Sequence, residues 1–123
     1  MHWSAWLPFG QVAELDAQTL HQLMQGDNAP QILDVRTRLE WRHGHLAGAR
    51  HMPLTRLPAA LADGARIAGL ALDPGRPVLA ICRSAHRSIP AVRMLRAHGF
   101  DAYQLRQGMQ AWWRAGLPVV TAF

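Results

Sequence analysis

Short runs of apolar residues alternate along the chain with segments that have helical character. The clearest run is Pro77-Val78-Leu79-Ala80-Ile81. Five apolar residues bounded by a proline are typical of a buried parallel strand. Residues 31–35 and 102–105 predict two further strands, and residues 49–52 predict a short one. Since strands that alternate with helices build βαβ units, we expect a parallel sheet with helices on both faces.

Capping residues mark where two of the intervening helices begin. Asp16 is placed as an N-cap, and Leu15 and Leu20 occupy the two positions of a hydrophobic staple. Thr37 and Glu40 fit a capping box, which predicts a short helix after the strand at 31–35.

Three more helices are expected in the second half of the chain. Residues 57–72 are rich in alanine and leucine, which favours a helix. A helix is predicted from about residue 88 to residue 98, because Pro90 fits only in a first helical turn. A last helix contains Trp112 and Trp113.

The composition limits the class of protein. The length of 123 residues predicts one domain, residues 1–123, and half of the residues are apolar, which excludes a disordered chain. No window reaches the roughly 18 apolar residues that a membrane span needs.

All 13 basic residues are arginines, spread from Arg36 to Arg114, so the net charge of +5 indicates a charged surface and not a nucleic-acid-binding face. The first residues do not resemble a signal peptide, and we expect the protein in the cytoplasm.

An apolar opening, residues 1–10, precedes the predicted sheet. Its large side chains are Trp3, Trp6, Leu7 and Phe9. Two roles are open for this extension: it covers the sheet, or it contacts a partner or a second copy of the chain.

The only cysteine, Cys82, directly follows the strand at 77–81 and precedes a helix. The N–H groups and the dipole of a helix N-terminus favour an anion there, and Arg83 and Arg87 add positive charge. Such surroundings favour the thiolate, which is the nucleophilic form of cysteine. We therefore predict that Cys82 is a catalytic nucleophile. A lone cysteine also excludes a disulfide within the chain and suits a reducing compartment.

Polar residues lie at the end of the strand predicted at 31–35. Cys82 follows the strand at 77–81, so both sets are expected at the same edge of the sheet. Ligands of parallel sheets bind outside the carboxyl ends of the strands, so Asp34 and Arg36 are expected near Cys82. We interpret both as supporting residues. Arg36 and Glu40 are spaced for an ion pair, and Asp34 is expected to accept hydrogen bonds from backbone N–H groups of a neighbouring loop.

Five sequence stretches, in a fixed order between residues 31 and 119, make the chain resemble a single-domain rhodanese, a sulfurtransferase. The stretches are Leu33-Asp34-Val35-Arg36 with Glu40 and Trp41, Gly44-His45-Leu46-Ala47-Gly48-Ala49, Cys82-Arg83-Ser84-Ala85-His86-Arg87-Ser88, Gly99-Phe100, and Gly108-Met109-Gln110-Ala111-Trp112. The resemblance implies an α/β fold with three layers, α/β/α, around a mainly parallel sheet of roughly five strands.

The resemblance also implies a mechanism. The Cys82 thiolate would take the sulfane sulfur of an anionic donor such as thiosulfate and would pass it from a persulfide to cyanide or a thiol. The expected partners are that donor, a small acceptor and, as an open possibility, a protein acceptor. No cofactor, nucleic acid or membrane is implied. The active-site loop would consist of Arg83, Ser84, Ala85, His86, Arg87 and Ser88.

Histidines are expected to have minor roles. His86 is interpreted as an exposed loop residue that contributes to specificity, since a thiolate needs no base. His43, His45 and His51 fit no zinc-binding spacing, so no metal site is predicted.

Two alternatives to the enzyme remain. The first is a rhodanese-like sulfur carrier or protein-binding module that does not turn over free thiosulfate. The second is a cysteine phosphatase or arsenate reductase. Those enzymes have five residues between cysteine and arginine, whereas four lie between Cys82 and Arg87 here, which disfavours phosphoryl transfer.

Overall fold

The computed structural model describes residues 6–7, 10–62 and 70–121, and within these ranges one parallel sheet organises the chain. Its strands are β1 (Glu14–Leu15), β2 (Gln31–Asp34), β3 (Arg50–His51), β4 (Val78–Ile81) and β5 (Ala102–Leu105). They lie in the order β1-β5-β4-β2-β3, and every neighbouring pair is parallel. The predicted α/β class with a five-stranded parallel sheet is confirmed.

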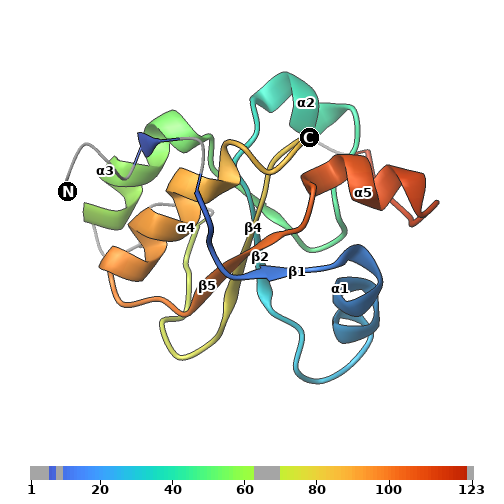
Figure 1. Ribbon diagram of the computed structural model, residues 1–123, viewed down its shortest axis with the longest axis horizontal. Helices are drawn as coiled ribbons and strands as arrows, with labels where there is room; N and C mark the ends of the chain where they lie inside the picture. Colours follow the sequence, from blue (N-terminus) through green and yellow to red (C-terminus); the bar gives the residue numbers. More distant parts are fainter. Residues whose placement is uncertain (1–5, 8–9, 63–69, 122–123) are drawn as a thin grey trace.

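Helices cover both faces of this sheet. They are α1 (Ala17–Met24), α2 (Arg38–Arg42), α3 (Leu57–Ala62), α4 (Ser88–Ala97) and α5 (Gly108–Arg114), with a 3₁₀ turn at Leu54–Arg56. Figure 1 shows α3 and α4 on one side of the strands and α1 and α5 on the other. None of the helices in the described part of the chain is long and apolar enough to cross a membrane.

The predicted helix starts are confirmed by their caps. Asp16 caps α1 by accepting a hydrogen bond from the Thr19 N–H at 2.8 Å. Thr37 and Glu40 form both halves of the capping box at the start of α2. Helix α4 begins at Ser88, which leaves Pro90 in the first turn as expected.

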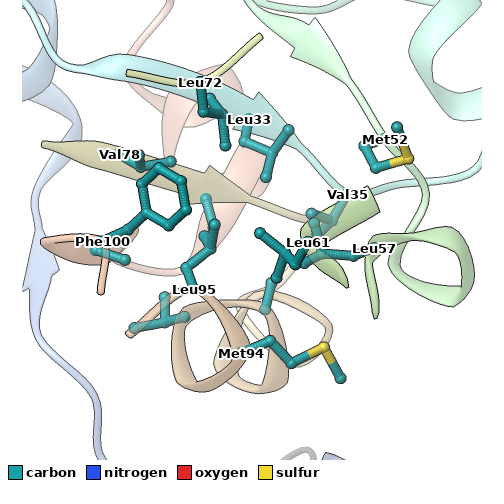
Figure 2. Packing of buried hydrophobic residues seen from close by; sticks show 14 of the residues in the cluster. Leu33, Val35, Met52, Leu57, Leu61, Leu72, Val78, Met94, Leu95 and Phe100 are labelled. Atoms are coloured by element: carbon teal, nitrogen blue, oxygen red, sulfur yellow. The ribbon is translucent and has the colours of Figure 1, made fainter. Parts of the chain in front are cut away.

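Two apolar clusters, one on each face, hold the layers together. Figure 2 shows the larger cluster, in which side chains from β2 and β4 pack against α3 and α4. The second cluster lies under α1 and α5 and includes the fully buried Trp112, whereas Trp113 is 45% exposed. Every residue of β2 and β4 is buried, and the sequence of β4 is accordingly a continuous apolar run.

Some predicted boundaries differ from the observed ones. The strand expected at 49–52 is only Arg50–His51, and β1 was not predicted because two residues carry no periodic signal. Of the helix expected at 57–72, α3 accounts for Leu57–Ala62, residues 63–69 lie outside the described residues, and residues 70–72 are not helical. Trp3 and Phe9 of the apolar opening also lie outside them, while Trp6 is 43% exposed.

Candidate active site

Cys82 lies at the carboxyl edge of the sheet, immediately after β4. The sheet order places β4 between β5 and β2, so the thiol follows a strand that is paired on both sides. The residue is only 1% exposed, and its Sγ lies 3.4 Å from the hydroxyl oxygen of Ser88 at the start of α4. The sequence-predicted nucleophile therefore sits beneath its own loop.

The loop at residues 83–87 curls between β4 and α4 as a series of bends. Ala85 adopts a left-handed backbone conformation with φ of 71°, and Arg87 is right-handed with φ of −73°. Within the described part of the chain, no backbone N–H of residues 83–87 donates to a backbone carbonyl. Curled loops with unpaired N–H groups bind anions, as do helix N-termini. The loop therefore offers donors to an anion beside Cys82.

Helix α5 supports this loop from the side of β5. The N–H of Met109 donates to the carbonyl of Cys82 at 2.8 Å, and the N–H of Gln110 donates to the carbonyl of Arg83 at 3.0 Å. Gly108 has φ of 57°, and a Cβ there would overlap the Cys82 carbonyl and lie 2.8 Å from the Arg83 carbonyl carbon and oxygen. Only glycine fits this close approach.

An ion pair ties the loop to α2. The Arg87 guanidinium donates to both carboxylate oxygens of Glu40, at 2.5 and 2.8 Å. Hydrogen bonding from Arg87, with a smaller contribution from Thr37, lowers the pKa of Glu40 to about 2, and the same pair raises the pKa of Arg87. Arg87 thus joins the loop to α2.

The expected pair between Arg36 and Glu40 is wrong. Arg36 instead turns back to Asp34, with Nη2 to Oδ2 at 2.8 Å and a second bond to the Gly44 carbonyl at 2.7 Å. Both members of this pair are 1% exposed. A buried arginine needs a carboxylate at this short range, whereas Glu40 already has a partner in Arg87. Asp34 accepts one backbone N–H, that of Arg36, at 3.0 Å.

The histidines near this edge bind backbone oxygens and stack on a tryptophan. His45 Nδ1 lies 2.8 Å from the carbonyl of Trp41, and His51 Nε2 lies 2.8 Å from the carbonyl of Arg36. The ring of Trp41 stacks on both imidazoles. Among the described residues, no three histidine, cysteine or acidic side chains are placed to hold a metal ion.

A pocket of about 240 Å³ opens beside the loop. Its lining residues are Arg36, Leu39, Glu40, His43, Gly44, Arg83 and Trp113. Arg83 lines this pocket, whereas Cys82 is not among the lining residues. His86 faces its own loop, with Nδ1 at 2.9 Å from the Ser84 hydroxyl.

Several residues of this region were not singled out from the sequence. Leu39 is 66% exposed at the pocket, and a large apolar residue on a predicted helix surface was the available signal. Gln104 is 4% exposed within β5 and accepts the hydrogen bond of Ser88. An amide in a strand otherwise built of apolar residues was the signal for Gln104. The contact of Gly108 with Cys82 had no local signal, because the two residues are distant in sequence.

The structure thus has a thiol at the carboxyl edge of a parallel α/β sheet, with four residues between Cys82 and Arg87 in the loop that leads to α4. The family model of the rhodanese-like domain matches residues 16–115. The chain belongs to the rhodanese-like domain family.

Known proteins resemble this chain over most of its length. A sulfurtransferase of Allochromatium vinosum is 30% identical over 110 residues, which cover 89% of this chain and 95% of that protein. An HTH-type transcriptional regulator of Mycobacterium tuberculosis is 38% identical over 108 residues, and the chain spans only 44% of its length. The crystal structure of a rhodanese-related protein from Thermoplasma volcanium superimposes with a TM-score of 0.74 at 26% identity, covering 90% of this chain and 100% of that one.

Proposed function

We propose that the protein is a sulfurtransferase that accepts the sulfane sulfur of thiosulfate on Cys82. The thiolate attacks the outer sulfur, a new S–S bond forms, and sulfite leaves with the electron pair of the old one. Cyanide or a thiolate then attacks the outer sulfur of the persulfide, and the Cys82 thiolate is released. We place this reaction in the cytoplasm, where a lone thiol stays reduced.

The observation that carries the proposal is the position of Cys82 under a loop whose backbone N–H groups are not used by the fold. During the transfer, negative charge moves from the Cys82 sulfur across the transferred sulfur to the departing sulfite. Backbone donors aimed at developing charge need no reorganisation, and one such donor is worth about 3 kcal/mol in other enzymes. The short loop supports sulfur transfer over transfer of a larger tetrahedral phosphoryl group.

The two arginines of the loop have different roles in this proposal. Arg87 is engaged by Glu40, whereas Arg83 has no ion-pair partner among the described residues and lines the pocket. We assign Arg83 to the anionic end of the donor. Arg87 holds the loop in shape, and its charge also acts on the site.

A second candidate function is sulfur delivery to a protein. The pocket is bordered by Leu39 and Trp113, which are 66% and 45% exposed. Apolar side chains left in solvent beside a reactive group suit a protein surface that carries the acceptor thiol. In this case free cyanide would be a poor acceptor, although Cys82 would still be loaded.

Intact-mass spectrometry of the reduced protein tests both candidates. Thiosulfate should add one sulfur atom, cyanide should remove it, and Cys82→Ser should show no adduct. Because the chain has one cysteine, the adduct has a unique position. An adduct that cyanide does not clear favours the carrier. If thiosulfate and mercaptopyruvate both leave the mass unchanged, the proposed reaction is wrong.

A further inference from the structure

A second pocket, with a volume of about 290 Å³, opens at the amino edge of the sheet. Its walls come from the end of α1, the start of β2, the turn before β3, β3 itself and the turn before β4. Figure 1 shows the connections that lead into β2 and β4 at the opposite end of the sheet from the loop after β4. The four residues of β4, about 13 Å of strand, separate this edge from Cys82. The pocket is therefore distinct from the candidate active site.

Two arginines on the wall of this pocket have no carboxylate partner among the described residues. They are Arg50 in β3 and Arg76 in the turn before β4. Each guanidinium donates to a neutral oxygen instead. Arg50 Nη1 lies 3.1 Å from Gln31 Oε1, and Arg76 Nη2 lies 3.0 Å from the carbonyl of Ala29. Since a guanidinium has five N–H donors, most donors of both arginines stay available to a ligand.

The buried side chain of Gln31 joins the two segments that carry these arginines. Gln31 is only 5% exposed. Its Oε1 accepts from Arg50 Nη1 and, at 2.7 Å, from the N–H of Asp73. Its Nε2 donates to the carbonyls of Asp73 and Arg76, at 2.8 and 3.1 Å. Because both lone pairs and both N–H groups of the buried amide are used, β3 and the turn before β4 are held in one geometry around the pocket.

The turn at residues 46–49 adds backbone donors to the same wall. The Ala49 N–H closes this turn on the carbonyl of Leu46 at 3.1 Å, and Gly48 is left-handed with φ of 77°. Ala47 and Gly48 both line the pocket. Their N–H groups donate to no backbone carbonyl in the part of the chain that the structure describes. Turn N–H groups of this kind, beside two guanidinium groups, favour an anion.

The composition of the wall indicates which anion fits. Of the described residues, no acidic one lines the pocket; Asp27 and Asp73 belong to adjoining turns, and Asp73 Oδ1 accepts from the Gly75 N–H at 2.8 Å. Two arginines match a doubly negative group with several oxygens, such as a phosphate near neutral pH. Met24 and Ile32 add an apolar surface beside the arginines.

We propose that this pocket binds a small organic phosphate ester, with its phosphate between Arg50 and Arg76 and its organic part against Met24 and Ile32. The proposal is independent of the sulfur-transfer reaction, because no residue of the pocket belongs to the loop at residues 83–87. The bound ester bridges β3 and the turn before β4. Because it binds the folded chain only, it raises the free energy of unfolding.

Phenyl phosphate is the probe, and amide NMR spectra at constant ionic strength locate its site. The amide signals of Ala47, Gly48, Arg50 and Arg76 should shift together and saturate with one Kd. Arg50→Met and Arg76→Met should each raise this Kd at least about ten-fold, the loss expected when a hydrogen bond to a charged group is removed. Arg76→Lys, which keeps the charge, should recover part of the affinity. Inorganic phosphate should shift the same amides with a higher Kd, since it does not contact the apolar surface.

Arg96→Met is the matched control variant. Arg96 is exposed like Arg76 and also donates to one backbone carbonyl, that of Ala102 at 2.7 Å, but it does not line the pocket. Its replacement should leave the Kd unchanged. Benzoate carries a carboxylate on the same ring and should bind more weakly than phenyl phosphate. Phenyl phosphate should also raise the Tm of the wild type and of Arg96→Met more than the Tm of Arg76→Met.

Three results would overturn the proposal: shifts confined to residues 83–87, equal Kd values in Arg76→Met and Arg96→Met, or tighter binding of benzoate than of phenyl phosphate. None of these readouts involves Cys82 or a sulfur donor. A failure of the sulfur transfer would appear only in the mass experiment with thiosulfate, so the two failures are distinguishable.

Discussion

Neighbouring arginines of one short loop are used in different ways. Arg87 is held by Glu40 through two hydrogen bonds, and Arg83 faces a pocket. A guanidinium that is paired with a carboxylate of the protein stabilises the loop, whereas a guanidinium without such a partner can bind an anion. The residue type alone does not separate these roles, and the difference becomes visible only when the partner residues are known.

Arg83→Ala should raise the KM for thiosulfate about ten-fold, because a hydrogen bond to a charged group is lost from substrate binding. The kcat should stay within about two-fold, since Arg83 does not touch Cys82 through any described contact. Arg83→Lys should recover part of the affinity. Steady-state kinetics with thiosulfate as the varied substrate decide the matter, and an unchanged KM in Arg83→Ala would refute the assignment.

At the residue scale, the sequence placed Cys82 and residues 83–88 between a strand and a helix, as the structure has them, but it did not predict the hydrogen bonds around them, and their catalytic role remains a prediction. A lone cysteine after an apolar strand carries its own signal. The pairing of Arg36 was predicted wrongly, because the i to i+4 rule applies within a helix and Arg36 precedes α2. Gln104 was missed, because its partners Ser88 and Glu14 are 16 and 90 positions away in the sequence.

Among the elements, α2 and the active-site loop are joined by the pair of Glu40 and Arg87. The pKa of Glu40 is lowered from 4.5 to about 2, chiefly by the hydrogen bonds from Arg87. A lowered folded-state pKa contributes stability that is fully present above 4.5 and is lost as the pH falls toward 2. Because the two side chains are 27% and 35% exposed, solvent screening keeps this contribution to about 1 kcal/mol or less.

Urea unfolding at a series of pH values, from about pH 5 to about pH 2, measures this contribution. In Glu40→Gln the free energy of unfolding should be lower at neutral pH and should fall less steeply with acid than in the wild type. Arg87→Met should show the same flattened profile, because it removes the other partner. Parallel profiles for wild type and Glu40→Gln would contradict the ion-pair assignment.

Helix α5 contacts the loop at Gly108. A matched pair of variants, at Gly108 and at Gly116, tests whether this contact matters. Gly108→Ala should reduce kcat strongly and cost about 1–3 kcal/mol of stability, because its Cβ would push against the carbonyls of Cys82 and Arg83. Gly116 has a similar φ of 67° but no atom near its Cβ position. Gly116→Ala should show the conformational cost alone, with normal kcat. Equal activity of the two variants would show that α5 does not set the loop geometry.

The sequence predicted the elements according to the strength of their local signals. Capping residues placed the starts of α1 and α2, and a proline placed the start of α4. Strand β1 was missed, because it consists of two residues and depends on pairing with β5. The boundaries of β3 depend in the same way on its neighbour β2.

For the whole molecule, the sequence predicted the class of fold but not the order of the strands. A continuous apolar run marks β4 as a central strand, and the burial of every residue of β2 and β4 agrees with a central place for both. The place of β5 between β1 and β4 has no signal in periodicity, because crossover connections decide it.

The central position of β4 has a consequence for hydrogen exchange. Its amides are paired with β2 and β5, so they exchange only when the molecule opens globally, whereas the amides of residues 83–87 have no backbone acceptors among the described residues and exchange freely. The boundary between the slowest and the fastest amides therefore falls at Cys82. The sulfur is thus attached to a strand in the middle of the sheet, while the loop proposed to bind the donor is the adjacent segment, whose amides are not held by the sheet.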